Sequence, residues 1–115
     1  MTDRSAAFPR ASRLTRPQEF KRVLSGPDWR RDGGPMRILI KANRQEQARL
    51  GLVVPKRWVR HAHDRNRCKR VVREAFRHLA HALPAVDIVI MIRGRIDASD
   101  ISLLIRRLLM SVPSP

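Results

Sequence analysis

The sequence predicts an α+β fold, a two-layer α-β sandwich with the element order α-β-β-β-α-β-α and helices mostly on one face of the sheet. Residues 65–83 repeat apolar side chains at the spacing of an amphipathic helix. Val86–Ile92 is almost continuously apolar and β-branched, which is typical of a strand buried on both faces. Residues 50–54 form a shorter strand candidate before the helix, so the three segments predict a β-α-β crossover with parallel strands.

The length of the chain fits one domain. It has 115 residues, and 43% of them are hydrophobic, which is enough for a core. We therefore expect a single domain over residues 1–115, with residues 1–12 as a flexible N-terminal arm and residues 112–115 as a tail.

A first helix is expected to begin near Pro17 and to end at Gly26. Proline fits the first turn of a helix, and Thr15-x-x-Gln18 has the spacing of a capping box. Residues 32–35 contain two glycines and a proline and predict a turn.

Two strands are expected next, Met36–Ala42 and residues 50–54, joined by polar residues. Their separation favours an antiparallel hairpin with a long loop. Residues 56–64 then form an irregular basic bridge into the helix of residues 65–83. A last helix is expected after Val86–Ile92, capped by Asp97 or Ser99. Its apolar side consists of Ile101, Leu104, Ile105, Leu108 and Leu109.

The helix of residues 65–83 has two chemically opposite sides. Its apolar side consists of Cys68, Val71, Val72, Ala75, Phe76, Leu79 and Leu83. Its other side carries Asn66, Lys69, Arg70, Arg73 and Arg77. Like charges follow one another at positions 65, 69, 73 and 77, and this spacing destabilises an isolated helix. The pattern therefore predicts that an anion binds the polar side.

The charge of the whole chain indicates the same kind of partner. There are 25 lysines and arginines against 10 aspartates and glutamates, a net charge of +15. Self-repulsion at that charge destabilises a compact protein unless a polyanion binds it, and nucleic acid is the leading candidate. The predominance of arginine favours paired hydrogen bonds to phosphate. An anionic membrane surface bound by the last amphipathic helix is a further alternative.

The acidic and nucleophilic residues form no recognisable catalytic set. The carboxylates are scattered along the chain, whereas metal-dependent hydrolysis needs them clustered. His61, His63 and Cys68 match no standard zinc spacing. We therefore expect no catalytic residue and no metal site in the protein itself, and His61 and His63 are left as candidates for contacts to a phosphate or a base.

The single cysteine cannot form an internal disulfide, which fits a reducing compartment. No apolar run approaches the roughly 18 residues of a transmembrane helix, and the N-terminus lacks the apolar segment of a secretory signal. We expect a cytoplasmic protein that binds no membrane.

Two aromatic residues have two candidate roles each. Phe20 either packs in the core or stacks a nucleic-acid base beside the cations. Trp58, inside the basic bridge, either stacks a base or anchors the loop. Aromatic residues make up only 4% of the chain, so binding of a single strand by stacking alone is not favoured.

Several segments together resemble the protein subunit of bacterial ribonuclease P, and the similarity spans nearly the whole chain. The most specific segment is similar to that family's signature helix, Arg65-Asn66-Arg67-x-Lys69-Arg70-x-x-Arg73-Glu74-x-Phe76-Arg77. The other pieces are Gly51-Leu52-Val53-Val54-Pro55-Lys56-Arg57, Arg13-Leu14 with Phe20 and Val23, Asp87-Ile88-Val89, and Arg93-Gly94. Each piece alone is weak, but their order and distances are specific.

The resemblance implies that a large RNA performs the metal-ion chemistry, with Mg²⁺ bound to that RNA and no cofactor bound by the protein alone. The implied partners are this catalytic RNA and precursor tRNA, whose 5′ leader is removed, and no protein partner is required. The resemblance also implies an uncommon left-handed β-α-β crossover, against the usual right-handed rule.

The resemblance assigns residues to two surfaces. RNA contacts are expected from Arg65, Asn66, Arg67, Lys69, Arg70, Arg73, Arg77, Lys56, Arg57 and Arg60. A cleft between the sheet and the first helix is expected to hold the leader, with Phe20, Arg13 and Lys21 at it. Arg65 falls near the apolar side of its helix, which leaves open that it braces the preceding loop instead.

Three positions depart from the family pattern. His63 stands where many relatives have a small or apolar residue, and Leu24 and Ile40 stand where relatives often carry phenylalanine or tyrosine. The cleft is therefore expected to bind the leader more by charge than by stacking. The alternative function is a non-enzymatic RNA-binding protein, ribosomal or chaperone-like, which shares the charge but gives no gain in tRNA processing.

Overall fold

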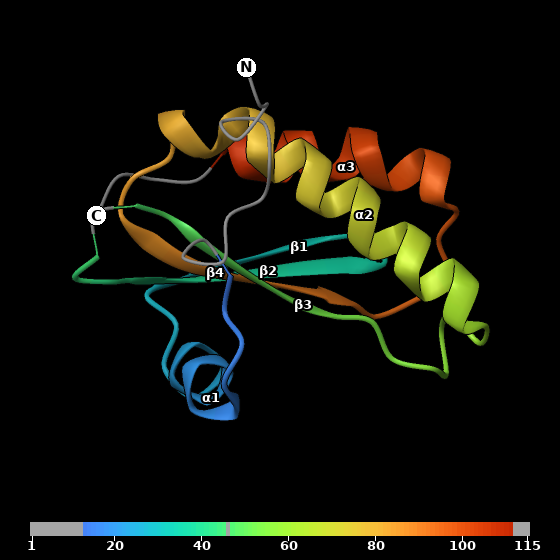
Figure 1. Ribbon diagram of the computed structural model, residues 1–115, viewed down its shortest axis with the longest axis horizontal. Coiled ribbons are helices and arrows are strands. Elements are labelled where there is room, and N and C mark those ends of the chain that lie inside the picture. The colour runs from blue at the N-terminus through green and yellow to red at the C-terminus, as the bar shows by residue number, and fades with distance from the viewer. Residues whose placement is uncertain (1–12, 46, 112–115) are drawn as a thin grey trace, which may run out of the picture.

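The computed structural model describes residues 13–45 and 47–111, so the predicted arm (1–12) and tail (112–115) lie outside the described residues. The elements confirm the predicted order α-β-β-β-α-β-α (Figure 1). They are α1 Pro17–Ser25, β1 Trp29–Gly33, β2 Met36–Ala42, β3 Arg49–Val53, α2 Ala62–Leu79 followed by a 3₁₀ turn Ala80–Ala82, β4 Val86–Ile92 and α3 Ala98–Met110.

The four strands form one sheet in the order β1-β2-β4-β3. β3 pairs with β4 in parallel, as predicted for the crossover. The predicted hairpin of β2 with β3 is wrong, because β4 lies between them and pairs antiparallel with β2. β4 is the most apolar strand, and all of its residues except Met91 are buried. A central place in the sheet lets helices cover both of its faces.

The hairpin partner of β2 is instead β1, a strand for which the sequence predicts no residues. Trp29–Gly33 is mostly polar and exposed, so it carries no alternating apolar pattern. The turn predicted at residues 32–35 does join these strands. Its Gly34 has a φ of 59°, a conformation that glycine adopts without the strain of a side chain.

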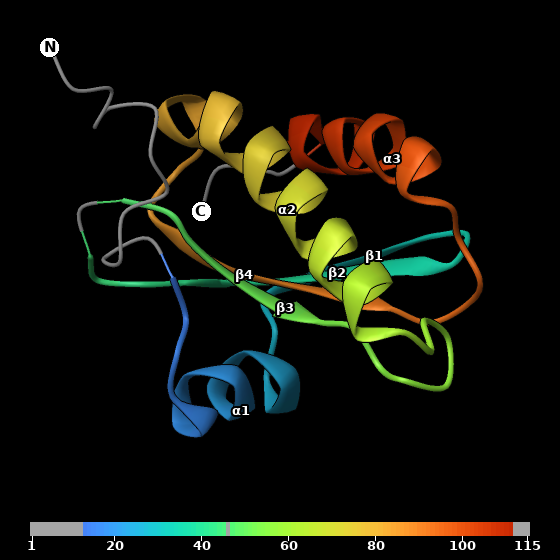
Figure 2. The same cartoon turned by 45° about the vertical axis from the view of Figure 1, so that its right-hand side comes forward.

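The connection between β3 and β4 is left-handed. In Figures 1 and 2, β3 lies in front of β4, both strands run from left to right, and α2 passes above the sheet on its way back. This hand agrees with the resemblance and departs from the usual rule for such crossovers.

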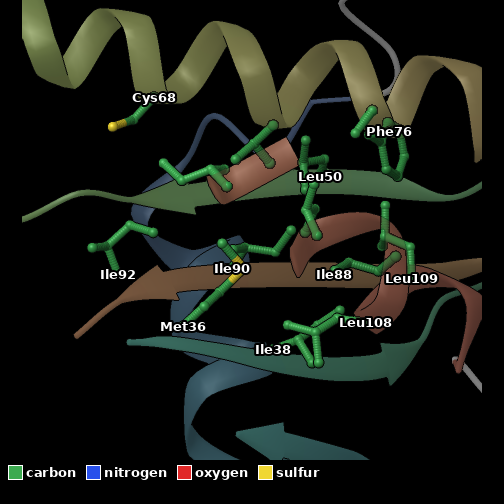
Figure 3. Close-up of a cluster of buried hydrophobic side chains, with 14 of the residues drawn as sticks. Met36, Ile38, Leu50, Cys68, Phe76, Ile88, Ile90, Ile92, Leu108 and Leu109 are labelled. Carbon is green, nitrogen blue, oxygen red and sulfur yellow. The ribbon is translucent and has the colours of Figure 1, made fainter. Parts of the chain in front are cut away.

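The helices cover the two faces unequally: α2 and α3 pack on one face, and α1 lies on the other (Figure 2). The larger core lies under α2 and α3, where Ile88 and Ile90 of β4 meet Phe76 of α2 and Leu109 of α3 (Figure 3). A smaller cluster lies under α1 and consists of Leu14, Val23, Leu39 and Val89, with Phe20, Val53 and Met91 against it.

A buried carboxylate connects α1 to this sheet. Asp87 of β4 is fully buried, and its two oxygens accept hydrogen bonds from Arg49 Nε and Nη2, each at 2.8 Å. Arg22 of α1 donates to Asp87 Oδ2 at 3.2 Å, and Asn43 donates to Oδ1 at 2.8 Å. Arg49 also donates to Glu19 of α1 at 2.8 Å, so one ion network spans β4, β3 and α1.

The start of α1 differs by one residue from the predicted capping pair of Thr15 and Gln18. The capping carboxylate is Glu19, whose Oε1 accepts from the backbone N–H groups of Thr15 and Arg16, each at 2.9 Å. These two bonds, followed by the charge of Arg49, hold the pKa of Glu19 below its ordinary value. Glu19 therefore both caps α1 and joins it to the ion network.

We predict that Asp87→Ala lowers the free energy of unfolding by about 3–5 kcal/mol, because it removes the carboxylate that Arg49 and Arg22 share inside the protein. Urea unfolding measures the loss. The matched control is Asp32→Ala, since Asp32 pairs with Arg37 at an exposed site. This substitution should lower the free energy of unfolding far less. Equal losses in the two variants would show that the buried network does not carry the stability assigned to it.

Candidate nucleic-acid interface

The amphipathic character of α2 is confirmed. Cys68, Val72 and Ala75 are buried along it together with Phe76, while Val71, Leu79 and Leu83 are partly buried. The helix begins at Ala62, three residues before the predicted start, and its regular part ends at Leu79. Asn66, Arg67 and Arg70 are exposed, whereas Lys69, Arg73 and Arg77 of the predicted polar side are partly covered.

The cations of α2 lie on its outward-facing crest, which carries Asn66, Arg67 and Arg70, and on two flanks, one toward α3 and one toward β3. Arg67 and Arg70 line a hollow between α2 and α3, together with Arg106 of α3. Lys69 and Arg73 lie at the opposite flank, beside the edge strand β3, and both are partly covered. α2 therefore presents cations to two separate surfaces rather than in one row.

The flank beside β3 forms a groove of about 170 Å³, which we call the Phe20 groove. It is lined by Arg13, Leu14, Thr15, Phe20, Leu50, Leu52, Lys69 and Arg73. Residues 13–14 run parallel to β3, and Leu14 N donates to Leu50 O at 2.9 Å. The groove therefore brings side chains from before α1, from α1 and from α2 together across one strand.

Of the three residues predicted for the leader cleft, Arg13 and Phe20 line this groove, and Lys21 lies exposed on α1 outside it. Lys69 and Arg73, which were predicted as RNA contacts of the long helix and not of the cleft, line the same groove. Only the helical position of these two residues, toward the flank nearest β3, could have indicated it.

Phe20 has the core-packing role among its two candidate roles, and part of its ring is also open to the groove. Its ring packs against the small cluster under α1 and also lines the groove. The ring lies directly on the backbone of β3, because a Cβ placed on Gly51 would be 2.6 Å from Phe20 Cε1. A glycine at position 51 is therefore required for Phe20 to sit where it does.

The electrostatics of the groove favour an anion. The pKa of Arg73 is lowered, first by burial and then by repulsion from the nearby charge of Arg13. Two guanidinium groups that repel each other in a partly buried groove gain stability when a phosphate lies near both.

Arg65 braces the preceding loop, which was the alternative to an RNA contact. Its Nη1 donates to the carbonyl oxygens of Val59 at 3.1 Å and Arg60 at 2.9 Å. Arg77 is also engaged within the protein, since it pairs with Glu74 near the end of α2. Among the residues that the structure describes, Asn66, Arg67 and Arg70 make no comparable side-chain hydrogen bond or ion pair.

The loop between β3 and α2 carries the remaining predicted contacts. Lys56, Arg57 and Arg60 are exposed on it. The guanidinium of Arg57 lies over the ring of Trp58, 5.8 Å from its centroid. Trp58 is partly buried against the core, so it anchors the loop, and it also lines a cavity on the α3 side of α2.

Two departures from the family pattern do not affect the groove. Ile40 is buried in the larger core under α2 and α3, on the opposite face of the sheet from α1. Leu24 is exposed on α1 and does not line the groove. The groove is poor in aromatic residues, as expected, since Phe20 is the only one among those that line it. The reason given for this was wrong, because neither Leu24 nor Ile40 lies at the groove.

No group of three histidine, cysteine or acidic side chains gathers in the described parts of the chain at a spacing that would hold a metal ion. Burial raises the pKa of the Cys68 thiol, which makes it a poor nucleophile. None of the described helices has the length and apolarity needed to cross a membrane. The side chains at the interface have the chemistry to bind phosphate, through their cations, and to stack a base, through Phe20.

The fold and this interface define a basic α+β protein that binds nucleic acid. Comparison with known proteins gives the family. The family model described as Ribonuclease P matches residues 8–112. The chain therefore belongs to the ribonuclease P protein family, whose members are protein components of an endoribonuclease.

Individual relatives agree with this assignment. The ribonuclease P protein component of Halorhodospira halophila is 43% identical over 93 residues, which cover 81% of this chain and 76% of the relative. That of Chromohalobacter salexigens is 41% identical over 101 residues, 88% of this chain and 79% of the relative. The solved RNase P protein from Thermotoga maritima has a TM-score of 0.75 at 26% identity, covering 89% of this chain and 98% of that one.

We predict that Gly51→Ala displaces the Phe20 ring from the groove, because the new methyl group would meet it at 2.6 Å. The binding of single-stranded RNA should weaken by about 1–3 kcal/mol if a base stacks on Phe20. Fluorescence anisotropy with a labelled oligonucleotide measures this. Gly26→Ala is the control, since a Cβ there meets only the end of Lys41 at 3.9 Å. An unchanged affinity in Gly51→Ala would remove Phe20 from the RNA surface.

Proposed function

We propose that this chain works with a catalytic RNA and helps it to remove the 5′ leader of precursor tRNA. Membership of the ribonuclease P protein family supports the proposal. The observation that carries it is the Phe20 groove, in which an aromatic ring and three cations from separate segments face one narrow channel. A single RNA strand offers matching chemistry, with a base for the ring and phosphates for the cations.

In this proposal the leader lies in the Phe20 groove. Its phosphates approach Arg13, Lys69 and Arg73, and one base stacks on Phe20. Because the rest of the lining is aliphatic or polar, charge contributes more than stacking, and the affinity should depend strongly on salt.

The catalytic RNA in turn meets the crest of α2 and the loop before it. The residues proposed to contact it are Asn66, Arg67, Arg70, Lys56, Arg57 and Arg60. These cations neutralise phosphates where RNA strands converge, which lowers the Mg²⁺ that the RNA needs to hold its structure. The protein itself is proposed to hold no cofactor, to need no protein partner and to work in the cytoplasm.

Reconstitution with a cognate catalytic RNA at low Mg²⁺ tests the function. Adding the protein should promote cleavage at the 5′ end of mature tRNA, and the protein alone should cleave nothing. A protein that binds RNA but gives no gain in processing would instead be the non-enzymatic RNA-binding protein of the alternative hypothesis.

We predict that Phe20→Ala weakens the binding of precursor tRNA more than that of mature tRNA, because only the precursor has a leader to stack. The loss should be about 1–3 kcal/mol for one base. The measurement compares the two dissociation constants in the assembled complex. Leu24→Ala is the control, since Leu24 is exposed on the same helix outside the groove. An equal loss for both tRNAs would return Phe20 to a purely structural role.

We predict that Arg70→Ala makes the affinity for the catalytic RNA less dependent on salt. Each lost phosphate contact should reduce the slope of log K against log salt by roughly 0.7–0.9. Binding is measured at several salt concentrations, beside Arg31→Ala on the exposed strand β1 as control. A slope that Arg70→Ala leaves unchanged would contradict direct contact.

A further inference from the structure

A second and larger cavity lies where α2 begins, and the proposed function does not use it. It has a volume of about 560 Å³, opens to the surface, and is bounded by the loop before α2, the first turns of α2 and the loop between β4 and α3. Figure 2 shows both loops at the end of the molecule where α2 starts. We call it the Trp58 pocket. Its volume lies within the range of about 300–1,000 Å³ that is usual for small-ligand sites.

The lining of the Trp58 pocket combines an apolar floor with a cationic rim. Val59 and Cys68 are buried at it, and Trp58 and Ile96 are partly buried against the core. The rim carries four arginines, Arg57, Arg60, Arg67 and Arg95, against two aspartates. A flat apolar group suits the floor, and an anion suits the rim.

The wall of the pocket is held in place before any ligand binds. Arg65 hydrogen bonds the carbonyl oxygens of Val59 and Arg60, which both line the pocket. Arg57 already lies over the indole of Trp58. A preformed site of this kind loses less conformational entropy on binding than a mobile loop would.

We propose that the Trp58 pocket binds one unpaired nucleotide of the catalytic RNA, with the base beside Trp58 and its phosphates at the surrounding arginines. The two aspartates at the pocket favour one chemical type of base. Asp64 and Asp97 offer carboxylate oxygens at the pocket, and carboxylates accept hydrogen bonds from the amino groups of bases. A base with an exocyclic amino group therefore fits better than uracil.

The position of the pocket indicates which RNA supplies the nucleotide. It lies at the α3 side of α2, where Arg67 also lines the hollow between the two helices. The Phe20 groove lies on the flank beside β3 and is proposed to hold the leader of precursor tRNA. We therefore assign the Trp58 pocket to the catalytic RNA. This inference rests on the proposed function for its partner and adds a subsite to it.

Fluorescence of Trp58 tests the site directly in the full chain. Trp29→Phe leaves Trp58 as the only tryptophan. Adding the catalytic RNA should quench Trp58, whereas a fully paired RNA duplex should bind the cations without quenching it. Quenching that needs precursor tRNA would overturn the assignment to the catalytic RNA, and complex formation with no quenching at all would overturn the pocket.

A charge reversal gives an independent test. Arg95→Glu alters an exposed pocket residue outside the core. It should weaken binding of the catalytic RNA about tenfold, because it removes a cation that meets phosphate and adds a carboxylate that repels it. Arg31→Glu makes the same charge change on β1 and should have a smaller effect. The ratio of precursor to mature tRNA binding should not change in either variant.

Equal losses in Arg95→Glu and Arg31→Glu would overturn the inference. In a further set of RNAs, each unpaired nucleotide of the catalytic RNA is replaced in turn by uracil. Replacement at one position should weaken binding of the unaltered protein about as much as Arg95→Glu does. At that position the replacement should not weaken binding of the Arg95→Glu variant any further. Failure of the proposed function would look different, since the unaltered protein would then not promote cleavage of precursor tRNA at all.

Discussion

The interaction on which the interface most depends is the buried pairing of Asp87 with Arg49. It ties the central strand β4 to the edge strand β3, and through Glu19 and Arg22 it fixes α1 against the sheet. A buried ion pair contributes little net stability compared with an apolar substitute, but it allows few alternative arrangements. Here it fixes α1 where the Phe20 ring meets β3. The shape of the groove is thus decided by residues that do not line it.

The second constraint is that α2 has to be both a core helix and a cationic surface. Its apolar side, which includes Phe76 and Val72, packs on the sheet, so every cation is displaced to the remaining arc. Because that arc is wide, the cations reach two flanks, Lys69 on one and Arg67 on the other. Mutual repulsion along the helix raises the free energy of the isolated protein, and bound phosphates offset it. The same sequence feature therefore lowers the stability of the isolated helix and gives it two cationic surfaces, one for each proposed RNA segment.

The elements that could be predicted from the sequence are those with a strong apolar period. Val86–Ile92 and the helix around Cys68 were located because burial leaves a visible pattern. The predicted order includes a third strand before α2, but β1 was not located because an exposed edge strand needs no such pattern. The hairpin of β2 with β3 was predicted wrongly because proximity in sequence favours local pairing, whereas the apolar β4 gains more from the central position.

The candidate site was predictable in its residue types but not in its geometry. Arg65 was placed near the buried side by its helical angle, and its bracing of the loop follows from that. The approach of Arg73 to Arg13 depends on where α1 lies, and no local pattern encodes this. That Trp58 and Arg95 line one pocket depends likewise on two loops, which follow the parallel strands β3 and β4 and so lie at one end of the sheet. Sequence periodicity reports what each segment buries, whereas a site between segments depends on the topology.

Since the groove and the pocket lie on opposite flanks of one helix, α2 fixes the distance between the two ligands that these sites are proposed to bind.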